Sequence, residues 1–184
     1  MIKLNGAAQR EFCFGANAAS ALAYFGSLSS MIQHLPHIEL LEEFSSSEVR
    51  VRYSSLELGA YTITVITDLV SEMDEDNLAI TIRPLDGREA VKSEATLNST
   101  IGYGYFASAA YLEDAGDKTL IDFRLKIAAT LPRPRGLRMM PGRVVSRIAS
   151  SISQGRVNEI IDGFMANAIE AYPQWLAEHK QPRL

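Results

Sequence analysis

The stretch IDFRLKI, residues 121–127, alternates between apolar and charged side chains. In an extended chain every second side chain points to the same face, so the apolar residues would share one face and the charged residues the other. The apolar set is Ile121, Phe123, Leu125 and Ile127. A strand of this kind has one dry face and one wet face, which is typical of an antiparallel sheet covered on one side.

The same period of two extends over most of residues 38–131. Turn signals interrupt it at Gly59, at the acidic cluster MDEDN (73–77) and at EDAGDK (113–118). Glycine, asparagine and aspartate at such points are typical of hairpin turns between antiparallel strands. Residues 87–98 lack a clear pattern and fit either a loop or an irregular edge strand.

Helical patterns flank this region on both sides. A first strand is expected at residues 8–14, and Asn17 is a good N-cap for the helix that follows it. A second short helix would be capped by Ser29 or Ser30. Pro36 ends it, because proline disfavours the helical conformation of the residue before it.

A long helix is predicted after Pro141. Its apolar stripe changes direction near Gln154–Gly155, which indicates a kink or a change of packing partner, and Pro173 is expected to end or bend it. The predicted fold class is α+β. It consists of a curved antiparallel sheet of six or seven strands wrapped around the long C-terminal helix, with two short helices after the first strand, in a single domain (1–184).

The composition is that of an ordinary globular domain, with 184 residues and a net charge of −4. The single cysteine, Cys13, cannot form an internal disulfide and is expected to be buried. No apolar run approaches the roughly 20 residues that span a bilayer. We therefore predict a cytoplasmic protein.

Motifs that would identify a reaction are missing from the sequence. His34 and His37 have no cysteine or carboxylate at ligand spacing, so a solvated turn is favoured over a metal site. No nucleophile motif, phosphate-binding loop or acid–base pair is recognisable, and GYG at 102–104 is more typical of a bend or a close approach in a strand. We predict neither a catalytic residue, nor a metal, nor a cofactor.

One strand is rich in tyrosine and small residues. Its alternating set is Ile101, Tyr103, Tyr105, Ala107, Ala109 and Tyr111. Tyrosine offers apolar area with one hydroxyl, which suits a cavity wall for a mostly apolar ligand. The same set also fits an ordinary sheet core or an outer face bearing aromatic residues.

Cations gather in one segment of this acidic chain. No acidic residue occurs between Asp122 and Glu159, whereas eight lysines and arginines do. The segment fits a solvated face or a surface for anionic lipid headgroups, because apolar side chains lie between the cations. Nucleic acid is disfavoured, since the chain is acidic overall. The candidate membrane-docking residues are Arg133, Arg135, Arg138, Met139, Met140 and Arg143, which would make the protein peripheral on a membrane.

The order of a strand, two short helices, antiparallel strands and a long C-terminal helix resembles the START-like helix-grip superfamily over residues 8–176. Its members include lipid-transfer domains, coenzyme Q-binding proteins, polyketide cyclases and plant pathogenesis-related proteins. A narrower likeness, carried by Leu131, Pro132, Tyr172 and Trp175, is to an uncharacterised branch found mainly in cyanobacteria and plastids. That branch has no assigned reaction, so it supplies no catalytic residue.

The resemblance implies a cavity between sheet and helix, and we expect an apolar space of roughly 300–1,000 Å³. The function expected from it is binding or carriage of a hydrophobic small molecule such as a lipid, a quinone or an isoprenoid. A cyclase or aromatase-type enzyme and a protein-interaction module with a filled core are the alternatives; which protein such a module would bind is unknown. The residues expected to line the cavity are Tyr61, Ile63, Ile80, Tyr103, Tyr105, Phe123 and Phe164.

Overall fold

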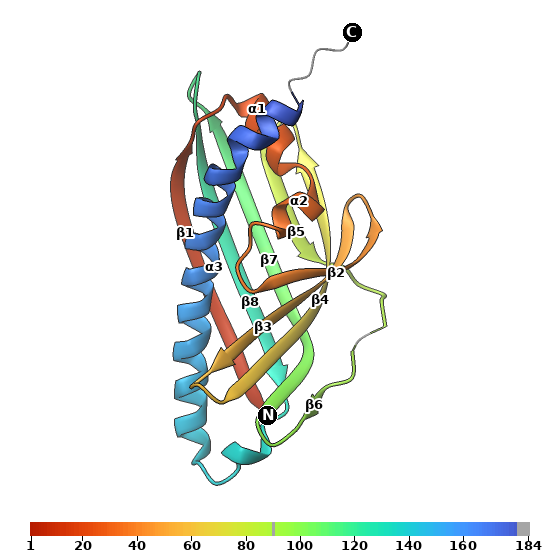
Figure 1. Ribbon diagram of the computed structural model, residues 1–184, viewed down its shortest axis with the longest axis vertical. Coiled ribbons are helices and arrows are strands. Elements are labelled where there is room, and N and C mark those ends of the chain that lie inside the picture. The colour runs from red at the N-terminus through yellow and green to blue at the C-terminus, as the bar shows by residue number, and fades with distance from the viewer. Residues whose placement is uncertain (90, 180–184) are drawn as a thin grey trace.

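The protein is described from a computed structural model, which covers residues 1–89 and 91–179. It is an α+β fold in which a strongly curved sheet faces one long helix (Figure 1). The strands are β1 (Ile2–Phe14), β2 (Ile38–Ser45), β3 (Glu48–Glu57), β4 (Tyr61–Asp74), β5 (Ala79–Pro84), β6 (Glu94–Ala95), β7 (Ser99–Asp114) and β8 (Thr119–Leu131). The helices are α1 (Ala18–Phe25), α2 (Leu28–Ile32), the short 3-10 helix η1 (Arg135–Leu137) and α3 (Gly142–His179).

The sheet order is β1-β8-β7-β5-β4-β3-β2, and these neighbours are antiparallel. β5 separates β4 from β7 along only part of their length. Beyond β5, Thr62–Ile66 of β4 pair directly with Ser99–Tyr103 of β7 in a parallel register. The eighth strand, β6, is a two-residue edge strand that pairs with β7. It lies within residues 87–98, which were expected to form a loop or an irregular edge strand. Counting β6 therefore gives one strand more than the six or seven expected.

The N-terminal elements differ from the prediction in detail. Asn17 caps α1 as expected, accepting a hydrogen bond from the Ser20 amide at 2.9 Å. α2 is capped by Ser27 instead of Ser29 or Ser30. β1 begins at Ile2, six residues earlier than expected, because its first half pairs with the end of β8.

α3 is one continuous helix of 38 residues that passes through Gly155 and Pro173. Of the two outcomes expected near Gly155, a kink or a change of packing partner, the apolar clusters show the second. Val145 and Ala149 belong to a small apolar cluster with Ile2, Leu4 and Leu131. The later apolar residues of α3, from Val157 to Tyr172, belong to the main core.

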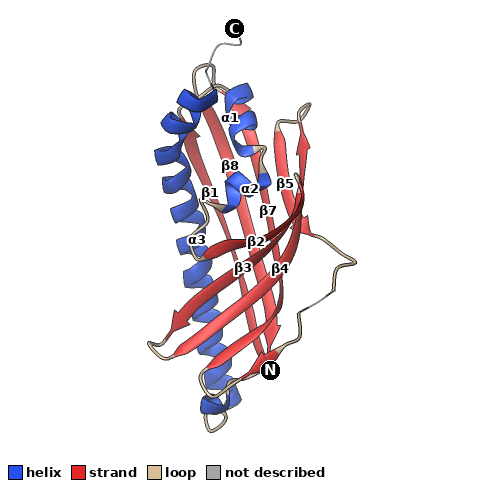
Figure 2. Cartoon of the chain, turned by 45° about the vertical axis from the view of Figure 1, so that its right-hand side comes forward, coloured by secondary structure: helices blue, strands red, loops and turns tan. Residues whose placement is uncertain are grey.

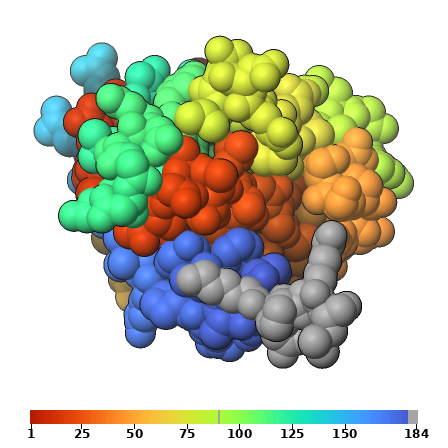
Figure 3. Space-filling view, turned by 90° about the horizontal axis from the view of Figure 1, so that it is seen from above, coloured from red at the N-terminus to blue at the C-terminus, as the bar shows by residue number. Residues whose placement is uncertain are grey.

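The main core occupies the upper end of the concave face, where α1 and α2 pack between α3 and the sheet (Figures 2 and 3). Its aromatic centre joins Phe14 to Tyr172, with ring centroids 4.7 Å apart, and Tyr24 to Trp175 at 5.2 Å. Aromatic pairs at such distances stabilise a core beyond their buried area. Cys13, expected to be buried, is exposed, because its neighbours Phe12 and Phe14 occupy the inner face of β1.

Gly6 of β1 lets α3 approach the sheet closely. A Cβ at this position would lie 2.7 Å from Val157 Cγ2 and 3.0 Å from the Ser153 carbonyl oxygen. The backbone oxygen belongs to a helix and cannot move away alone. A side chain at position 6 would therefore push α3 away from β1.

Gly6→Ala is predicted to lower the free energy of unfolding by about 1–3 kcal/mol, the usual cost of overpacking. Urea denaturation measures it. The control is Gly15→Ala, where an added Cβ meets nothing within 4 Å in the described part of the chain. Equal stability of the two variants would show that the contact between α3 and β1 is not tight.

Candidate functional site

The candidate site lies between α3 and the half of the sheet that α3 does not touch. The helix packs mainly along β1, at one edge of the sheet, and contacts β8 less. The strands β3, β4 and β7 curve round to face it from the other side (Figure 2). An interior space is therefore enclosed by the concave face and the side of α3 that points away from β1.

Two small chambers occupy this space. The central chamber is lined by residues that include Val51, Tyr53, Ser55, Val65, Phe106 and Arg156, and the lower chamber by residues that include Glu57, Tyr61, Leu131, Leu137, Val145 and Ile148. Leu4, Ile63 and Ile152 line both chambers. These three aliphatic side chains form the partition between them.

Each chamber has a volume of about 50 Å³. A single water needs about 10–15 Å³ on this measure, so each chamber has room for a few water molecules. Among residues 1–89 and 91–179, the space between α3 and the sheet is therefore much smaller than the 300–1,000 Å³ expected from the sequence. The partition residues fill the middle of the space, and the aromatic core fills its upper end.

The expected lining residues separate into three groups. Ile63 lines both chambers and Tyr61 lines the lower one. Ile80, Phe123 and Phe164 do point inward, but they lie in the solid core above, where the rings of Phe123 and Phe164 are 4.7 Å apart. The solid core therefore ends where the central chamber begins.

Tyr103 and Tyr105 lie on the outer face of the sheet. The pairing of β7 with β8 places Gly104 and Phe106 opposite Ala129 and Ile127 on the inner face, so the tyrosines between them point outward. Tyr105 is 42% exposed, although it is also among the residues that border the central chamber. The interpretation of this strand as a tyrosine-lined cavity wall is wrong, and the outer-face alternative is correct.

Tyr103 lies beside a buried ion pair between Arg50 and Asp68 on that outer face. Its hydroxyl accepts a hydrogen bond from the Asp68 amide at 3.2 Å. The Asp68 carboxylate is fully buried and accepts two hydrogen bonds from Arg50, at 2.6 and 2.9 Å. A paired charge of this kind is structural, because removing one partner would leave the other buried and uncompensated.

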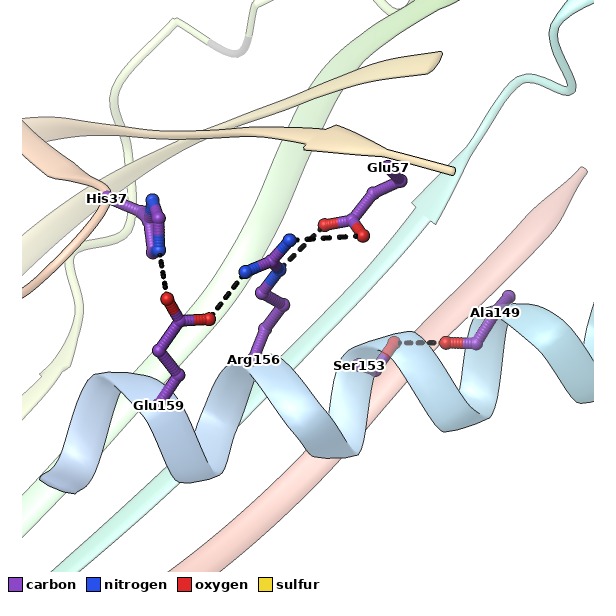
Figure 4. A network of polar contacts seen from close by, with 6 residues as sticks. All are labelled: His37, Glu57, Ala149, Ser153, Arg156 and Glu159. Carbon is purple, nitrogen blue, oxygen red and sulfur yellow. Dashed lines mark hydrogen bonds and ion pairs between the residues drawn. The ribbon is translucent and has the colours of Figure 1, made fainter. Parts of the chain in front are cut away.

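A polar seam closes the gap between α3 and β3 (Figure 4). Arg156 of α3 donates two hydrogen bonds to the Glu57 carboxylate of β3, at 2.8 and 3.3 Å, and a third to Glu159. The other Glu159 oxygen lies 2.8 Å from His37 Nε2. We call His37, Glu57, Arg156 and Glu159 the seam. It ties α3 to β3 and to the turn before β2.

Two groups of the seam have pKa values shifted toward their charged forms. The pKa of Arg156 is raised, chiefly by its hydrogen bonds to Glu57 and then to Glu159. The pKa of Glu159 is lowered, chiefly by its hydrogen bond with His37. Desolvation raises this pKa in part, and the hydrogen bond with Arg156 lowers it further. His37 has a backbone φ of 63°, a left-handed conformation that is uncommon outside glycine. The unfavourable backbone conformation of His37 thus occurs at the position where its ring contacts Glu159.

The hydroxyl side chains Tyr53 and Ser55 of β3 line the central chamber beneath the seam, and Thr67 and Ser153 line it as well. Desolvation by burial raises the pKa of Tyr53, against a smaller lowering by the neighbouring Ser55 hydroxyl. The Tyr53 hydroxyl therefore stays protonated at neutral pH. It can donate or accept a hydrogen bond, but it makes a poor general base.

The cationic segment lies at the lower end of the molecule, around η1 and the start of α3 (Figure 1). Arg135, Arg138, Met139 and Arg143 are exposed as expected of docking residues. Arg133 and Met140, in contrast, are only partly exposed. Arg133 donates hydrogen bonds to the carbonyl oxygens of Leu137 and Met140 and so stabilises the turn between them. The Met140 side chain packs against the small apolar cluster that contains Leu131 and Val145.

The two histidines near Pro36 are more ordered than a solvated turn would be. His34 Nε2 lies 3.0 Å from the Tyr24 hydroxyl, and burial lowers the pKa of His34. Over residues 1–89 and 91–179, no three His, Cys, Asp or Glu side chains gather as a metal site. None of the helices in these ranges combines the length and the apolar character that crossing a membrane requires.

Comparisons with known proteins identify the fold. No protein-family model matches the sequence, and no curated protein sequence is significantly similar to it. Solved structures do match: the Zhui aromatase/cyclase of Streptomyces sp. R1128 at 10% identity over 96% of both chains, with a TM-score of 0.52. A START superfamily protein of Mycobacterium smegmatis matches at 12% identity over 92% of this chain and 98% of that one, with a TM-score of 0.51.

A conserved protein of Geobacillus kaustophilus matches at 9% identity over 93% of this chain and 96% of that one, with a TM-score of 0.53. The chain therefore has the START-like helix-grip fold. At these identities the likeness shows the fold alone. The narrower likeness to a cyanobacterial and plastid branch stays a prediction.

Ser55, Glu57 and Arg156 are site residues that the sequence did not predict. A signal for the first two was present, because Val49, Val51 and Tyr53 alternate on the inner face of β3 and the next two inward positions are Ser55 and Glu57. Polar side chains at inward positions of a half-buried strand indicate a site. Nothing in the sequence indicates that Arg156 is their partner, since 99 residues separate it from Glu57.

The raised pKa of Tyr53 predicts a loss of stability at alkaline pH. The folded state holds the phenolic proton more tightly than the unfolded state, whose pKa is about 10. This contribution is therefore complete below pH 10 and is lost as the pH rises through the folded pKa. The urea midpoint should fall between pH 8 and pH 11, and Tyr53→Phe should reduce that fall. Tyr111→Phe, at a side chain that is 45% exposed, is the control; an equal reduction in both variants would contradict the assignment.

Proposed function

We propose that the protein binds and carries a hydrophobic small molecule, such as a lipid, a quinone or an isoprenoid, in the space between α3 and the sheet. The observation that carries this proposal is the pair of adjoining chambers, separated only by aliphatic side chains. Apolar walls that are not packed against one another favour an apolar ligand. Each Å² of apolar surface that the ligand removes from water contributes about 25 cal/mol to the free energy of binding.

A ligand of ordinary size requires the two chambers to join. Ile152, on α3, is only partly buried, as is Ile63 of β4, whereas Leu4 is buried. On the β3 side the seam ties the helix down. Its His37–Glu159 pair is 33% and 45% exposed and contributes little to stability, whereas Arg156 and Glu57 are 26% and 8% exposed. Movement of α3 away from β3 would hydrate Arg156 and Glu57 together, so neither charge would be left buried without a partner.

A cyclase or aromatase-type reaction in the same space is less well supported. The Zhui protein has this fold and is an aromatase/cyclase. In the described part of this chain, however, Glu57 is the only carboxylate that lines either chamber, and Arg156 holds it. The protonated Tyr53 is no base at neutral pH. Carriage needs none of these groups to react.

Substitution of Ile152 tests the proposal in two directions. Ile152→Trp should fill the chambers and weaken binding of the fluorescent apolar probe N-phenyl-1-naphthylamine at least 10-fold, whereas Ile152→Ala should join the chambers and strengthen it. Ile169→Trp, at a side chain of α3 that is 46% exposed, should bind the probe like the wild type. Urea midpoints confirm that the variants fold.

Probe binding that ignores both Ile152 substitutions would place the probe elsewhere and contradict the proposal. Native mass spectrometry of protein purified from its own host, followed by organic extraction, identifies the natural ligand. A ligand-free protein that also fails to bind the probe would favour the third class, an interaction module with a filled core.

The lower end of the molecule supports a second proposal, that the protein docks on an anionic membrane to exchange its ligand. Three separate segments each expose a large apolar side chain there: Leu58 between β3 and β4, Leu97 before β7 and Met139 before α3, at 62%, 68% and 94% exposure. Leu97 is tied to η1, because its carbonyl oxygen accepts a hydrogen bond from the Gly136 amide. Leu58 borders the lower chamber together with Leu137. We call Leu58, Leu97 and Met139 the lower tip.

Unpaired cations surround the lower tip. Arg135, Arg138, Arg143 and Arg147 are exposed and form no ion pair with any residue that the structure describes. Apolar side chains among cations suit the interface of an anionic bilayer, where each arginine adds about 1 kcal/mol and salt weakens the attraction. The proposal supports the predicted peripheral location and gives the ligand a dry path to the lower chamber.

Leu58 provides the sharpest test of docking. Its φ is 52° and that of Gly59 is 68°, so both central residues of this turn need a left-handed conformation, which asparagine tolerates much better than leucine. Leu58→Asn should therefore stabilise the fold, by a few tenths to 1 kcal/mol in urea, and yet weaken binding to phosphatidylserine vesicles in flotation. A purely structural turn would predict the first effect without the second.

Charge removal tests the same surface independently. Replacing Arg135, Arg138 and Arg143 together by Gln should weaken vesicle binding at low salt more than 10-fold. The matched control replaces Arg83, Lys118 and Lys126 by Gln. These residues lie in β5, in the turn before β8 and in β8, and their replacement changes the net charge equally. Similar losses in both triple variants would show that net charge alone matters.

A further inference from the structure

The central chamber contains one buried polar atom without a partner. Ser55 lies on the inner face of β3, opposite Ile63 of β4, and is 6% exposed. Among the residues that the structure describes, nothing forms a hydrogen bond with its Oγ. Burying a hydroxyl without a hydrogen bond destabilises a folded protein, so such groups are rare and call for an explanation.

A second serine of the same chamber shows the usual arrangement. Ser153 of α3 is also buried, but its hydroxyl donates to the Ala149 carbonyl oxygen at 2.7 Å (Figure 4). It is satisfied within its own helix. Ser55 is on a strand whose backbone groups are engaged in the sheet, so its hydroxyl has only the chamber to face.

Tyr53 is the polar neighbour of Ser55 on the same face of β3. The Ser55 hydroxyl approaches Tyr53 closely enough to lower the Tyr53 pKa as a weak hydrogen-bond partner, but the geometry falls short of a well-formed hydrogen bond. The His37 ring stands edge-on to the Tyr53 ring, with centroids 6.3 Å apart. Two hydroxyls of β3 are thus presented together in a chamber whose other polar lining residues include Thr67, Ser153 and Arg156.

The seam decides the charge that this wall accepts. Arg156 lines the chamber but is already shared between Glu57 and Glu159. A carboxylate in the chamber would compete with these two acids for one guanidinium, and an amine would be repelled by that guanidinium. A neutral group meets neither cost.

We propose that Ser55, with Tyr53, binds a neutral oxygen, a hydroxyl or a carbonyl, at one end of an otherwise apolar ligand. This rests on the proposed carrier function and names the class of molecule carried. It excludes plain hydrocarbons and ionised fatty acids as preferred ligands. The ligand oxygen would then form the hydrogen bond that Ser55 Oγ lacks within the protein.

Three probes of one shape test this: naphthalene, 1-naphthol and 1-naphthoate, measured by equilibrium dialysis at pH 7. Transfer into an apolar cavity without a partner favours naphthalene over naphthol. The wild type should nevertheless bind 1-naphthol most tightly and 1-naphthoate least. Ser55→Ala should weaken naphthol binding about 5- to 10-fold, the worth of one hydrogen bond, and leave naphthalene binding unchanged.

Stability supplies a second readout. Ser55→Ala should raise the urea midpoint of the ligand-free protein, because it removes the unsatisfied group. The matched control is Ser29→Ala in α2, whose buried hydroxyl likewise has no partner among the described residues but does not line either chamber. It should keep the wild-type ratio of naphthol to naphthalene binding.

The outcomes separate this inference from the proposed function. Naphthalene binding without a preference for naphthol, or a preference that survives Ser55→Ala, overturns the inference and leaves the carrier standing. Failure of all three probes to bind the wild type overturns the carrier, and the inference with it.

Discussion

The contact between α3 and β1 determines the rest of the structure. Gly6 allows the helix to lie against this edge strand so closely that Val157 and the Ser153 backbone would touch any side chain at that position. A helix held at one edge of a curved sheet cannot also contact the opposite edge. The space facing β3 and β4 is therefore a consequence of where the helix packs, and the chambers are what the inward side chains leave unfilled.

The gap that results is closed by ions instead of by apolar packing. Had β3 met α3 through leucines, opening the gap would expose apolar surface to water, at about 25 cal/mol per Å². The seam of His37, Glu57, Arg156 and Glu159 can be hydrated as it opens, because both charges of the Arg156–Glu57 pair would enter water together. The closed form is thus held at the correct distance without a large barrier to opening, which suits a protein whose interior must exchange its contents.

Three locally unfavourable residues lie at the proposed sites, although Leu78 in the turn before β5 also has a left-handed backbone and Ser29 of α2 also has an unsatisfied hydroxyl. Ser55 is buried without a partner, while Leu58 and His37 have left-handed backbones that cost stability. Leu58 exposes an apolar side chain at the lower tip, and His37 completes the seam. Conflicts between local preference and fold are expected to concentrate where function requires them.

The sequence alone determined the class and order of the elements. The period-two pattern of residues 38–131, the Asn17 cap and the apolar stripe of the last helix depend on neighbours within a few residues, and these are what a single sequence displays. It also indicated a kink or a change of packing partner near Gly155 in α3, because a stripe that rotates requires the helix to bend or to meet a new surface. The cation-rich segment around Arg135 and Arg138 was visible in the same way.

Only the tertiary structure decided which face of each strand is inside and what fills the interior. Alternation in β7 is equally consistent with tyrosines inside or outside, and pairing with β8, through Gly104 and Phe106, settles it. The size of the chambers depends on Leu4, Ile63 and Ile152 meeting from three distant segments. The seam joins residues up to 122 positions apart. Such contacts are set by the curvature of the sheet and the position of the helix, which no local pattern encodes.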